Sequence, residues 1–226
     1  MVNENTLCVG ILCAVVPIAL CFLRLITILP ALRANKEPKL SRNSGIFPGA
    51  KLMILLGSGG HTGEMLRLVE NTNVAECSRT WLVSSGDNAS LVKAKNFEES
   101  LGAKNFADVH YAELYRARKV KEPLISSVMS TVKSIYSTAQ QLRHLPHPDI
   151  LLVNGPGTSV PVAYLLFTMK LLGLCKTRII YVESLARVHS LSLSGRLILP
   201  IANRFLVQWT PLAAKYKRAE YYGILI

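Results

Sequence analysis

The sequence predicts an α/β protein in which a mostly parallel sheet carries helices on both faces, preceded by one N-terminal transmembrane helix. Short aliphatic or β-branched runs alternate with longer segments of helical period, which indicates βαβ units. Turns rich in glycine and hydroxyl residues follow several of the short runs, as expected where parallel strands end. An uncharged apolar run near the N-terminus predicts the membrane helix.

Composition excludes several classes of protein. Hydrophobic residues make up 50% of the 226 residues and charged residues only 18%, which excludes a disordered chain. The excess of 26 Lys and Arg over 14 Asp and Glu predicts an anionic partner, either a membrane surface or phosphates. So few charges argue against nucleic acid. The five cysteines have no metal-ligand spacing, so no metal site is predicted.

The N-terminal region predicts a membrane anchor. Leu7–Leu23 contains no charged residue, and apolar character resumes beyond Arg24 to Leu32. Since a crossing helix needs roughly 20 apolar residues, we expect an anchor with an interfacial continuation at 7–32 and a short lumenal segment at 1–6. The first six residues lack the positive charge of a cleaved signal peptide.

Basic residues follow the anchor in a linker at 33–49, and they place the remaining domain at 50–226 in the cytosol by the positive-inside rule. The sequon Asn88-Ala89-Ser90 should then never be glycosylated. The expected strands of the domain are Lys51–Leu56, Thr80–Ser84, Val109–Tyr111, Ile150–Asn154, Arg178–Val182 and Arg204–Gln208. The expected helices lie at about 62–71, 123–142 and 161–172, the second beginning at Pro123.

Ligands bind beyond the carboxyl ends of parallel strands, and the first such turn holds Gly57, Ser58, Gly59, Gly60, His61 and Thr62. Glycines there let backbone amides approach an anion or a sugar, and the next helix points its positive end at the same place. Because a helix N-terminus disfavours positive charge, His61 is a candidate neutral base at pH 7; the alternative is a histidine that only caps the helix. Thr62 replaces the third glycine of a dinucleotide fingerprint, which makes a nucleotide-dependent oxidoreductase a weaker alternative.

Two further turns are candidate binding sites. Asn154, Gly155, Gly157 and Thr158 suit a phosphate or a sugar hydroxyl, or form a tight corner with a helix cap. Glu183, Ser184 and Arg187 follow the next strand; they could orient a hydroxyl and a phosphate, or form an ordinary helical ion pair. The basic cluster Arg116, Arg118, Lys119 and Lys121 is either a solvated face or a contact for acidic lipids.

Five segments, in this order, resemble one family. They are GSGGHTGEML at 57–66, LLVNGPGT at 151–158, YVESLARVHSLSLSGRL at 181–197, VQW at 207–209 and YYGILI at 221–226. The family comprises the membrane-anchored subunits of the dolichol-pathway UDP-N-acetylglucosamine transferase, the asparagine-linked glycosylation protein fourteen family. The resemblance implies the Rossmann-like N-terminal half of a GT-B glycosyltransferase, similar to the bacterial transferase that forms lipid II.

The same resemblance implies that the complete enzyme adds the second GlcNAc to GlcNAc-diphosphodolichol from UDP-GlcNAc, without a cofactor. It places the chain in the endoplasmic reticulum membrane, including the nuclear envelope. The implied partner is a soluble catalytic subunit. A larger complex with the first GlcNAc-phosphate transferase or the first mannosyltransferase is a further option. His61 matches the base candidate of the bacterial relative, and Glu183 is a second candidate for the base.

One domain is only half of a GT-B enzyme, so the chain is expected to be inactive alone. Chain ends normally fray in water, but the last residues of this chain are apolar. We therefore expect the C-terminal segment to dock against the partner through Tyr222, Gly223, Ile224, Leu225 and Ile226. Two alternatives from other classes stay open. One is a membrane recruiter without a catalytic group, and the other is a basic adaptor for acidic lipids.

Overall fold

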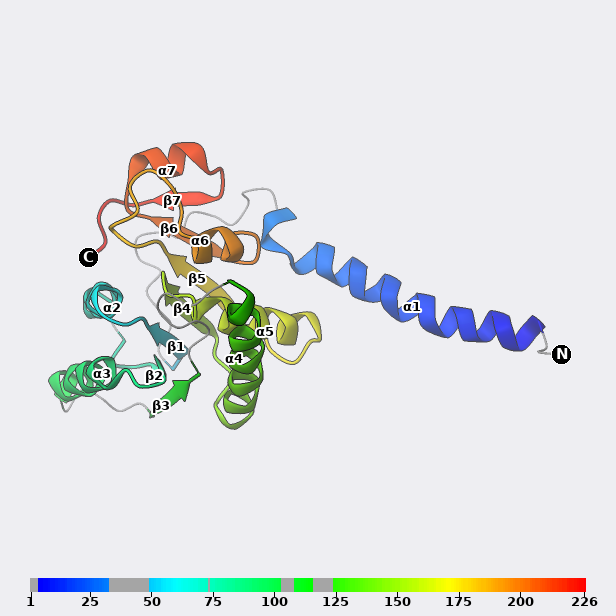
Figure 1. Ribbon diagram of the computed structural model, residues 1–226, viewed down its shortest axis with the longest axis horizontal. Helices are drawn as coiled ribbons and strands as arrows, with labels where there is room; N and C mark the ends of the chain where they lie inside the picture. The colour runs from blue at the N-terminus through cyan, green and yellow to red at the C-terminus, as the bar shows by residue number, and fades with distance from the viewer. Residues whose placement is uncertain (1–3, 33–48, 73, 103–107, 116–123) are drawn as a thin grey trace.

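A seven-stranded sheet forms the centre of the protein, and helices cover both of its faces (Figure 1). This computed structural model describes residues 4–32, 49–72, 74–102, 108–115 and 124–226. The strands are β1 (Lys51–Leu56), β2 (Ser78–Ser84), β3 (Val109–Leu114), β4 (Ile150–Asn154), β5 (Arg178–Val182), β6 (Arg204–Val207) and β7 (Ala219–Tyr221).

The strands are ordered β3-β2-β1-β4-β5-β6-β7, and every neighbouring pair is parallel. The chain runs outward from β1 to β3 and then returns to pair β4 with the other side of β1. The order therefore reverses between β1 and β4, and this switch point is where an open α/β sheet has its main ligand-binding crevice.

Each face of the sheet has its own apolar core. In β1, Met53 and Leu55 contribute to one core and Ile54 and Leu56 to the other, and all four are buried. Helices α2 (Gly60–Glu70) and α3 (Asn88–Leu101) cover the second face. The first face is covered by α4 (Leu124–His144), α5 (Ser159–Leu171), α6 (Leu193–Ile198) and α7 (Thr210–Lys215). A strand buried on both sides explains the continuous apolar run of β1.

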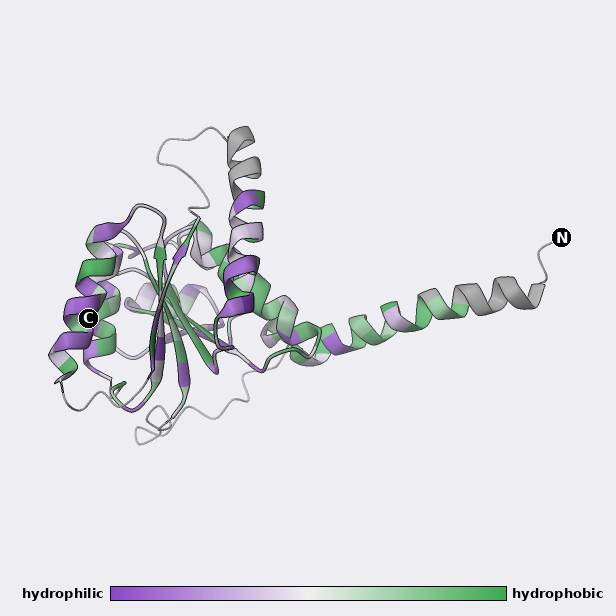
Figure 2. Cartoon of the chain, turned by 90° about the horizontal axis from the view of Figure 1, so that it is seen from below, coloured by the Kyte–Doolittle hydropathy of each residue, from purple (hydrophilic) through white to green (hydrophobic). Residues whose placement is uncertain are grey.

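Helix α1 (Glu4–Ile28) projects from the domain, and only its C-terminal end is docked (Figures 1 and 2). Leu25, Ile28 and Leu29 pack against the core beneath α5 and α6. The Arg24 guanidinium donates a hydrogen bond of 3.4 Å to the carbonyl of Lys170 at the end of α5. A short 3-10 turn, η1 (Pro30–Leu32), follows α1.

Across the described residues, none of the helices is long and apolar enough to cross a membrane. The predicted span at Leu7–Leu23 is therefore not confirmed, although a helix is present there. Of the predicted linker at 33–49, residues 33–48 lie outside the described residues.

The predicted α/β class is confirmed, and each predicted strand and helix of the domain is present. The main additions are α3, which was not predicted from the sequence, and the edge strand β7.

A buried ion pair joins helix α3 to the sheet. Arg79 of β2 donates two hydrogen bonds, of 2.7 and 2.8 Å, to the Glu98 carboxylate, and Trp81 donates a third of 2.6 Å.

Candidate functional site

The turns after β1 and β4 meet at the switch point, and the turn after β5 reaches them through the hydrogen bond of Ser184 with Glu64. The turn after β1 begins with the buried Gly57 and continues through the exposed Ser58, Gly59 and Gly60. Gly59 precedes α2 with a φ of 67°, a conformation that favours glycine. The backbone amides at the start of α2 have no partner within the helix, so they face the open side of the turn.

His61 is the second residue of α2, which begins two residues before the predicted start at about 62, and its imidazole lies against the turn after β4. A Cβ atom added at Gly155 would lie 2.6 Å from His61 Cε1, which shows how closely the ring packs on this backbone. Asn154 donates a hydrogen bond of 2.8 Å from Nδ2 to the carbonyl of His61. These contacts hold His61 at the junction of the two turns.

The ring of His61 has one buried side and one accessible side. About a third of the side chain is exposed, at 35%, whereas Nδ1 is buried and has no hydrogen-bond partner among the described residues. Nδ1 therefore lies on the buried side of the ring, which makes Nε2 the candidate nitrogen for contact with a ligand. The Oδ1 atom of Asn154 is also buried without a partner in the described part of the chain.

Two of the predicted binding hydroxyls are buried and bonded inside the protein. Thr62 donates a hydrogen bond to the carbonyl of Gly57 and lies 2.6 Å from the Ser90 hydroxyl. The hydroxyl of Thr158 lies 3.0 Å from that of Ser84. Both threonines thus stabilise the turns that they belong to.

Glu183 is fully buried directly after β5, and its carboxylate is bonded to its own loop. It accepts hydrogen bonds from the backbone amides of Ser184 at 3.2 Å and Ser192 at 2.9 Å, and from the Ser192 hydroxyl at 3.1 Å. Burial raises the pKa of Glu183, while these hydrogen bonds and the charge of Arg187 oppose the increase. This arrangement shapes the loop at 184–192 and does not expose the carboxylate to the turns.

Glu64 is a site residue that the sequence analysis did not single out. Its Oε2 lies 3.5 Å from His61 Nδ1, one helical turn earlier on α2. Its Oε1 accepts a hydrogen bond of 2.8 Å from the hydroxyl of Ser184, which is one of the predicted site residues. The three-residue spacing from His61 was the signal that could have found it, because such residues share a helix face.

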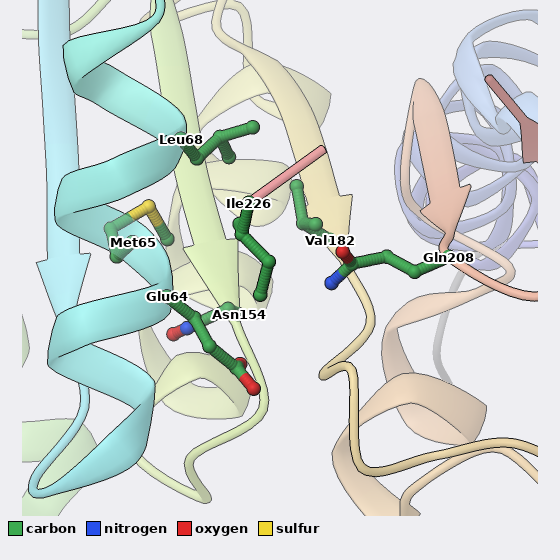
Figure 3. Close-up of a pocket in the computed structure, with 7 residues that line it drawn as sticks. All are labelled: Glu64, Met65, Leu68, Asn154, Val182, Gln208 and Ile226. Carbon is green, nitrogen blue, oxygen red and sulfur yellow. The ribbon is translucent and has the colours of Figure 1, made fainter. Parts of the chain in front are cut away.

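A small pocket lies beside these residues, between α2, the ends of β4 and β5, and the C-terminal segment (Figure 3). Its apolar lining comes from Met65, Leu68, Val182 and Ile226, and its polar lining from Glu64, Asn154 and Gln208. Gln208 accepts a hydrogen bond of 3.3 Å from the amide of Leu225 and donates one of 3.0 Å to the carbonyl of Glu183.

The remaining predicted residues differ in how exposed they are. Arg187 is exposed on the loop after β5. In the C-terminal segment, Tyr222 and Ile224 are exposed, while Gly223, Leu225 and Ile226 are partly buried. The cluster Arg116, Arg118, Lys119 and Lys121 lies outside the described residues. No group of three or more His, Cys, Asp or Glu side chains that could hold a metal ion occurs in the described part of the chain.

Comparison with known proteins identifies the family. A family model described as "Oligosaccharide biosynthesis protein Alg14 like" matches residues 52–225. The chain belongs to this family. It is 52% identical over 229 residues to the UDP-N-acetylglucosamine transferase subunit ALG14 of Debaryomyces hansenii, with 99% of each chain covered. It is 38% identical to the rat protein of the same name, covering 77% of this chain and 82% of the rat protein. The resemblance found in the sequence is therefore confirmed.

A solved structure shows the same fold. MurG of Acinetobacter baumannii superposes with a TM-score of 0.52 at 17% identity, covering 78% of this chain. The chain spans about half the length of that protein, 45% of it. The fold expected for the domain of an Alg14-like chain, one Rossmann-like unit, is confirmed.

Proposed function

We propose that this chain is the acceptor-side subunit of a two-chain, inverting UDP-GlcNAc transferase. The reaction adds the second GlcNAc to GlcNAc-diphosphodolichol, an early step of N-glycan precursor synthesis. Family membership supports this assignment, as do the relatives, which are named as UDP-N-acetylglucosamine transferase subunits.

The observation that carries the proposal is the position of His61 at the switch point. The imidazole has an accessible edge, sits at the start of α2, and packs on the glycine turn that follows β4. A base in this position can reach a hydroxyl group of a ligand that is held over the two turns.

In the proposed step, the acceptor 4-hydroxyl oxygen attacks the anomeric carbon of UDP-GlcNAc. The new bond joins that oxygen to the carbon as the bond from the carbon to the β-phosphate oxygen breaks. UDP leaves with the bonding electron pair, and Nε2 of His61 takes the hydroxyl proton. Attack opposite the leaving group inverts the anomeric carbon.

The turn after β1 is suited to the diphosphate of the acceptor. Exposed Ser58, Gly59 and Gly60 bring backbone amides and the positive end of α2 to one place. The exposed Arg187 and the turn containing Gly155 and Gly157 are further candidate contacts for phosphate or sugar.

A two-chain enzyme explains the size of the domain. The chain spans 45% of MurG, so a second unit is needed to complete a cleft of the same kind. The exposed Tyr222 and Ile224 are candidate contacts for the soluble subunit that supplies the UDP-GlcNAc half. The chain alone is expected to transfer no sugar.

Helix α1 is the candidate membrane-associating segment, which holds the chain at the endoplasmic reticulum membrane with its domain in the cytosol. Its projecting part exposes large apolar side chains, among them Leu12, Ile18 and Phe22, each more than half exposed. Water does not favour such a surface on an isolated helix. Association with the membrane would also raise the effective concentration of a lipid-linked acceptor.

The test is transfer of labelled GlcNAc from UDP-GlcNAc to GlcNAc-diphospho-lipid by membranes that carry this chain. The wild type should be active only when the cognate soluble subunit is present. His61→Ala should still capture the subunit but lose at least about 100-fold in turnover, the usual contribution of a general base.

Other outcomes would contradict the proposal. Transfer by the chain alone would disprove the two-chain model. Full turnover by His61→Ala would remove His61 as the base, and if variants of Glu183 were also fully active, the chain would be a recruiter without a catalytic group.

A further inference from the structure

Two buried polar atoms face each other at the base of the site. Nδ1 of His61 and Oε2 of Glu64 are 3.5 Å apart, and neither has a hydrogen-bond partner among the described residues. Buried polar atoms are almost always paired, so this pair has an unmet hydrogen bond. Only a small movement of either side chain is needed to form it.

The second oxygen of Glu64 is anchored from the other side of the cleft. Oε1 accepts a hydrogen bond of 2.8 Å from Ser184, which follows β5. Ser184 is itself buried and fixed, because its amide donates to Glu183 and its hydroxyl accepts a hydrogen bond from the amide of Ala186. Glu64 is therefore held between α2 and the β5 loop, with its free oxygen directed at His61.

The backbone around the imidazole limits how the ring can turn. Gly155 packs on the ring edge, and a Cβ atom there would lie 3.2 Å from both ring nitrogens. Asn154 holds the His61 carbonyl. Of the two ring nitrogens, Nδ1 is buried and faces the carboxylate, which leaves Nε2 as the nitrogen available to a ligand.

We propose that Glu64 is a positioning residue for His61, a role that rests on the proposed function. Its carboxylate accepts a hydrogen bond from Nδ1–H, which fixes the tautomer whose lone pair is on Nε2. That nitrogen then takes the proton of the acceptor hydroxyl, while Glu64 keeps its charge and touches no substrate. Glu64 would thus orient His61 as the third group of a catalytic triad orients its histidine base. Catalytic hydrogen bonds are often long without substrate and shorten when it binds, which fits the separation of 3.5 Å.

An ordinary ion pair between neighbours on a helix is the competing explanation. In that case Glu64 would not set the tautomer of the neutral ring, and loss of Glu64 would change only stability. The tautomer of His61 and the division of an activity loss between kcat and KM separate the two explanations.

The first experiment reads the tautomer directly. The full chain is labelled with ¹⁵N-histidine, placed in lipid nanodiscs with the soluble subunit, and studied by ¹H–¹⁵N NMR at pH 8, where imidazole is generally neutral. The His61→Ala variant assigns the signal among the five histidines. We expect the Nδ1–H tautomer in the wild type and a mixture, or the Nε2–H tautomer, in Glu64→Gln.

The second experiment measures transfer by Glu64→Gln in the same complex. We expect kcat to fall about 100-fold with KM for the lipid acceptor changed less than about threefold. Glu70→Gln is the matched control, since Glu70 is an exposed glutamate at the other end of α2. It should leave kcat unchanged.

An Nε2–H tautomer in the wild type would overturn the proposal, and that measurement needs no variant to fold. A wild-type kcat in Glu64→Gln would overturn it too, as would a lowered kcat with an unchanged His61 tautomer. Full activity of His61→Ala would instead refute the base role in the proposed function, and the NMR result would still report on the positioning.

Discussion

At the scale of single residues, the site depends on close contact between glycine backbone and one imidazole. Gly57 and Gly155 both pack against His61, at distances that leave no room for a side chain. From the sequence, the glycines of these turns are expected to let a ligand approach the backbone closely. The structure adds that two of them make space for the candidate base.

Gly155→Ala should inactivate the complex without unfolding it. The new methyl group would lie 2.6 Å from His61 Cε1, so the ring must move, and a displacement of about 1 Å can cost about 100-fold in rate. The measurements are kcat in the transfer assay and the thermal midpoint of the chain in detergent.

Gly63→Ala provides the comparison for stability. Gly63 lies on α2 next to these residues, and a Cβ atom there would contact nothing. It should raise the free energy of unfolding by about 0.5–1 kcal/mol, the usual gain from Gly to Ala in a helix. A Gly155→Ala variant as active as the wild type would show that the position of the ring is unimportant.

Glu183 predicts a pH dependence of stability. Burial is the largest cause that raises its pKa above the ordinary value of 4.5. An acid whose pKa is raised by folding contributes stability below its unfolded pKa and loses that contribution as pH rises through the folded pKa. Relative to Glu183→Gln, which has no proton to lose, the wild type should therefore lose unfolding free energy between pH 4.5 and neutral pH.

Urea unfolding of both chains in detergent, at pH 5 and pH 7.5, measures this difference. If the difference between wild type and Glu183→Gln is the same at both values, the carboxyl group does not titrate in this range. The hydrogen bonds from Ser192 and Ser184 would then outweigh burial.

At the scale of elements, pattern predicted most of the fold. Runs such as Lys51–Leu56 and Ile150–Asn154 are apolar throughout, which is the pattern of a strand buried on both faces. Helix α3 was not assigned because its sequence is polar, and only three of its residues are buried: Ser90, Ala94 and Glu98. Strand β7 has three residues and lies at the edge of the sheet, too short for periodicity to reveal.

The candidate site was predicted in part for a similar reason. The order of strands and turns placed His61, Asn154 and Ser184 at one end of the sheet, and the structure brings them together. Which hydroxyls would be buried, as those of Thr62 and Thr158 are, depends on contacts across the sheet that no local pattern encodes. The same holds for the link from Ser184 to Glu64, which joins residues 120 positions apart.

Glu98 should contribute strongly to the stability of the fold, because it joins α3 to β2 through a buried ion pair. Arg79 is fully buried and the Glu98 side chain only 8% exposed, so Glu98→Ala leaves a buried guanidinium without its carboxylate. Breaking a buried pair in this way costs about 3–5 kcal/mol. The measurement is urea unfolding in detergent.

Glu220→Ala is the matched change in a more exposed ion pair, since its partner Arg204 and Glu220 itself are 16% and 29% exposed. It should cost about 1 kcal/mol, because solvent screens the charges that remain. Equal losses from the two changes would mean that burial of the Arg79–Glu98 pair has no special cost.

At the scale of the whole molecule, the C-terminal segment connects the site with a candidate partner surface. Ile226 lines the pocket beside Glu64 (Figure 3), whereas Tyr222 and Ile224 remain exposed. Tyr222 is held in place by a hydrogen bond of 2.7 Å from Arg204, which also lies over its ring. The segment thus exposes the side chains of Tyr222 and Ile224 while Arg204 of β6 holds Tyr222 in place.

Ile224→Ser should weaken binding of the soluble subunit while leaving the fold of this chain intact. The side chain is 56% exposed, so its removal costs the free chain little. Burial of an isoleucine at an interface is worth about 1.5–3 kcal/mol, which corresponds to roughly a 10- to 100-fold increase in Kd. Titration of the subunit against the full chain in nanodiscs measures the change.

Val132→Ser on α4 is the control, because Val132 is 55% exposed on a helix of the opposite face. A Kd unchanged by Ile224→Ser, or raised equally by Val132→Ser, would place the partner surface elsewhere on the domain.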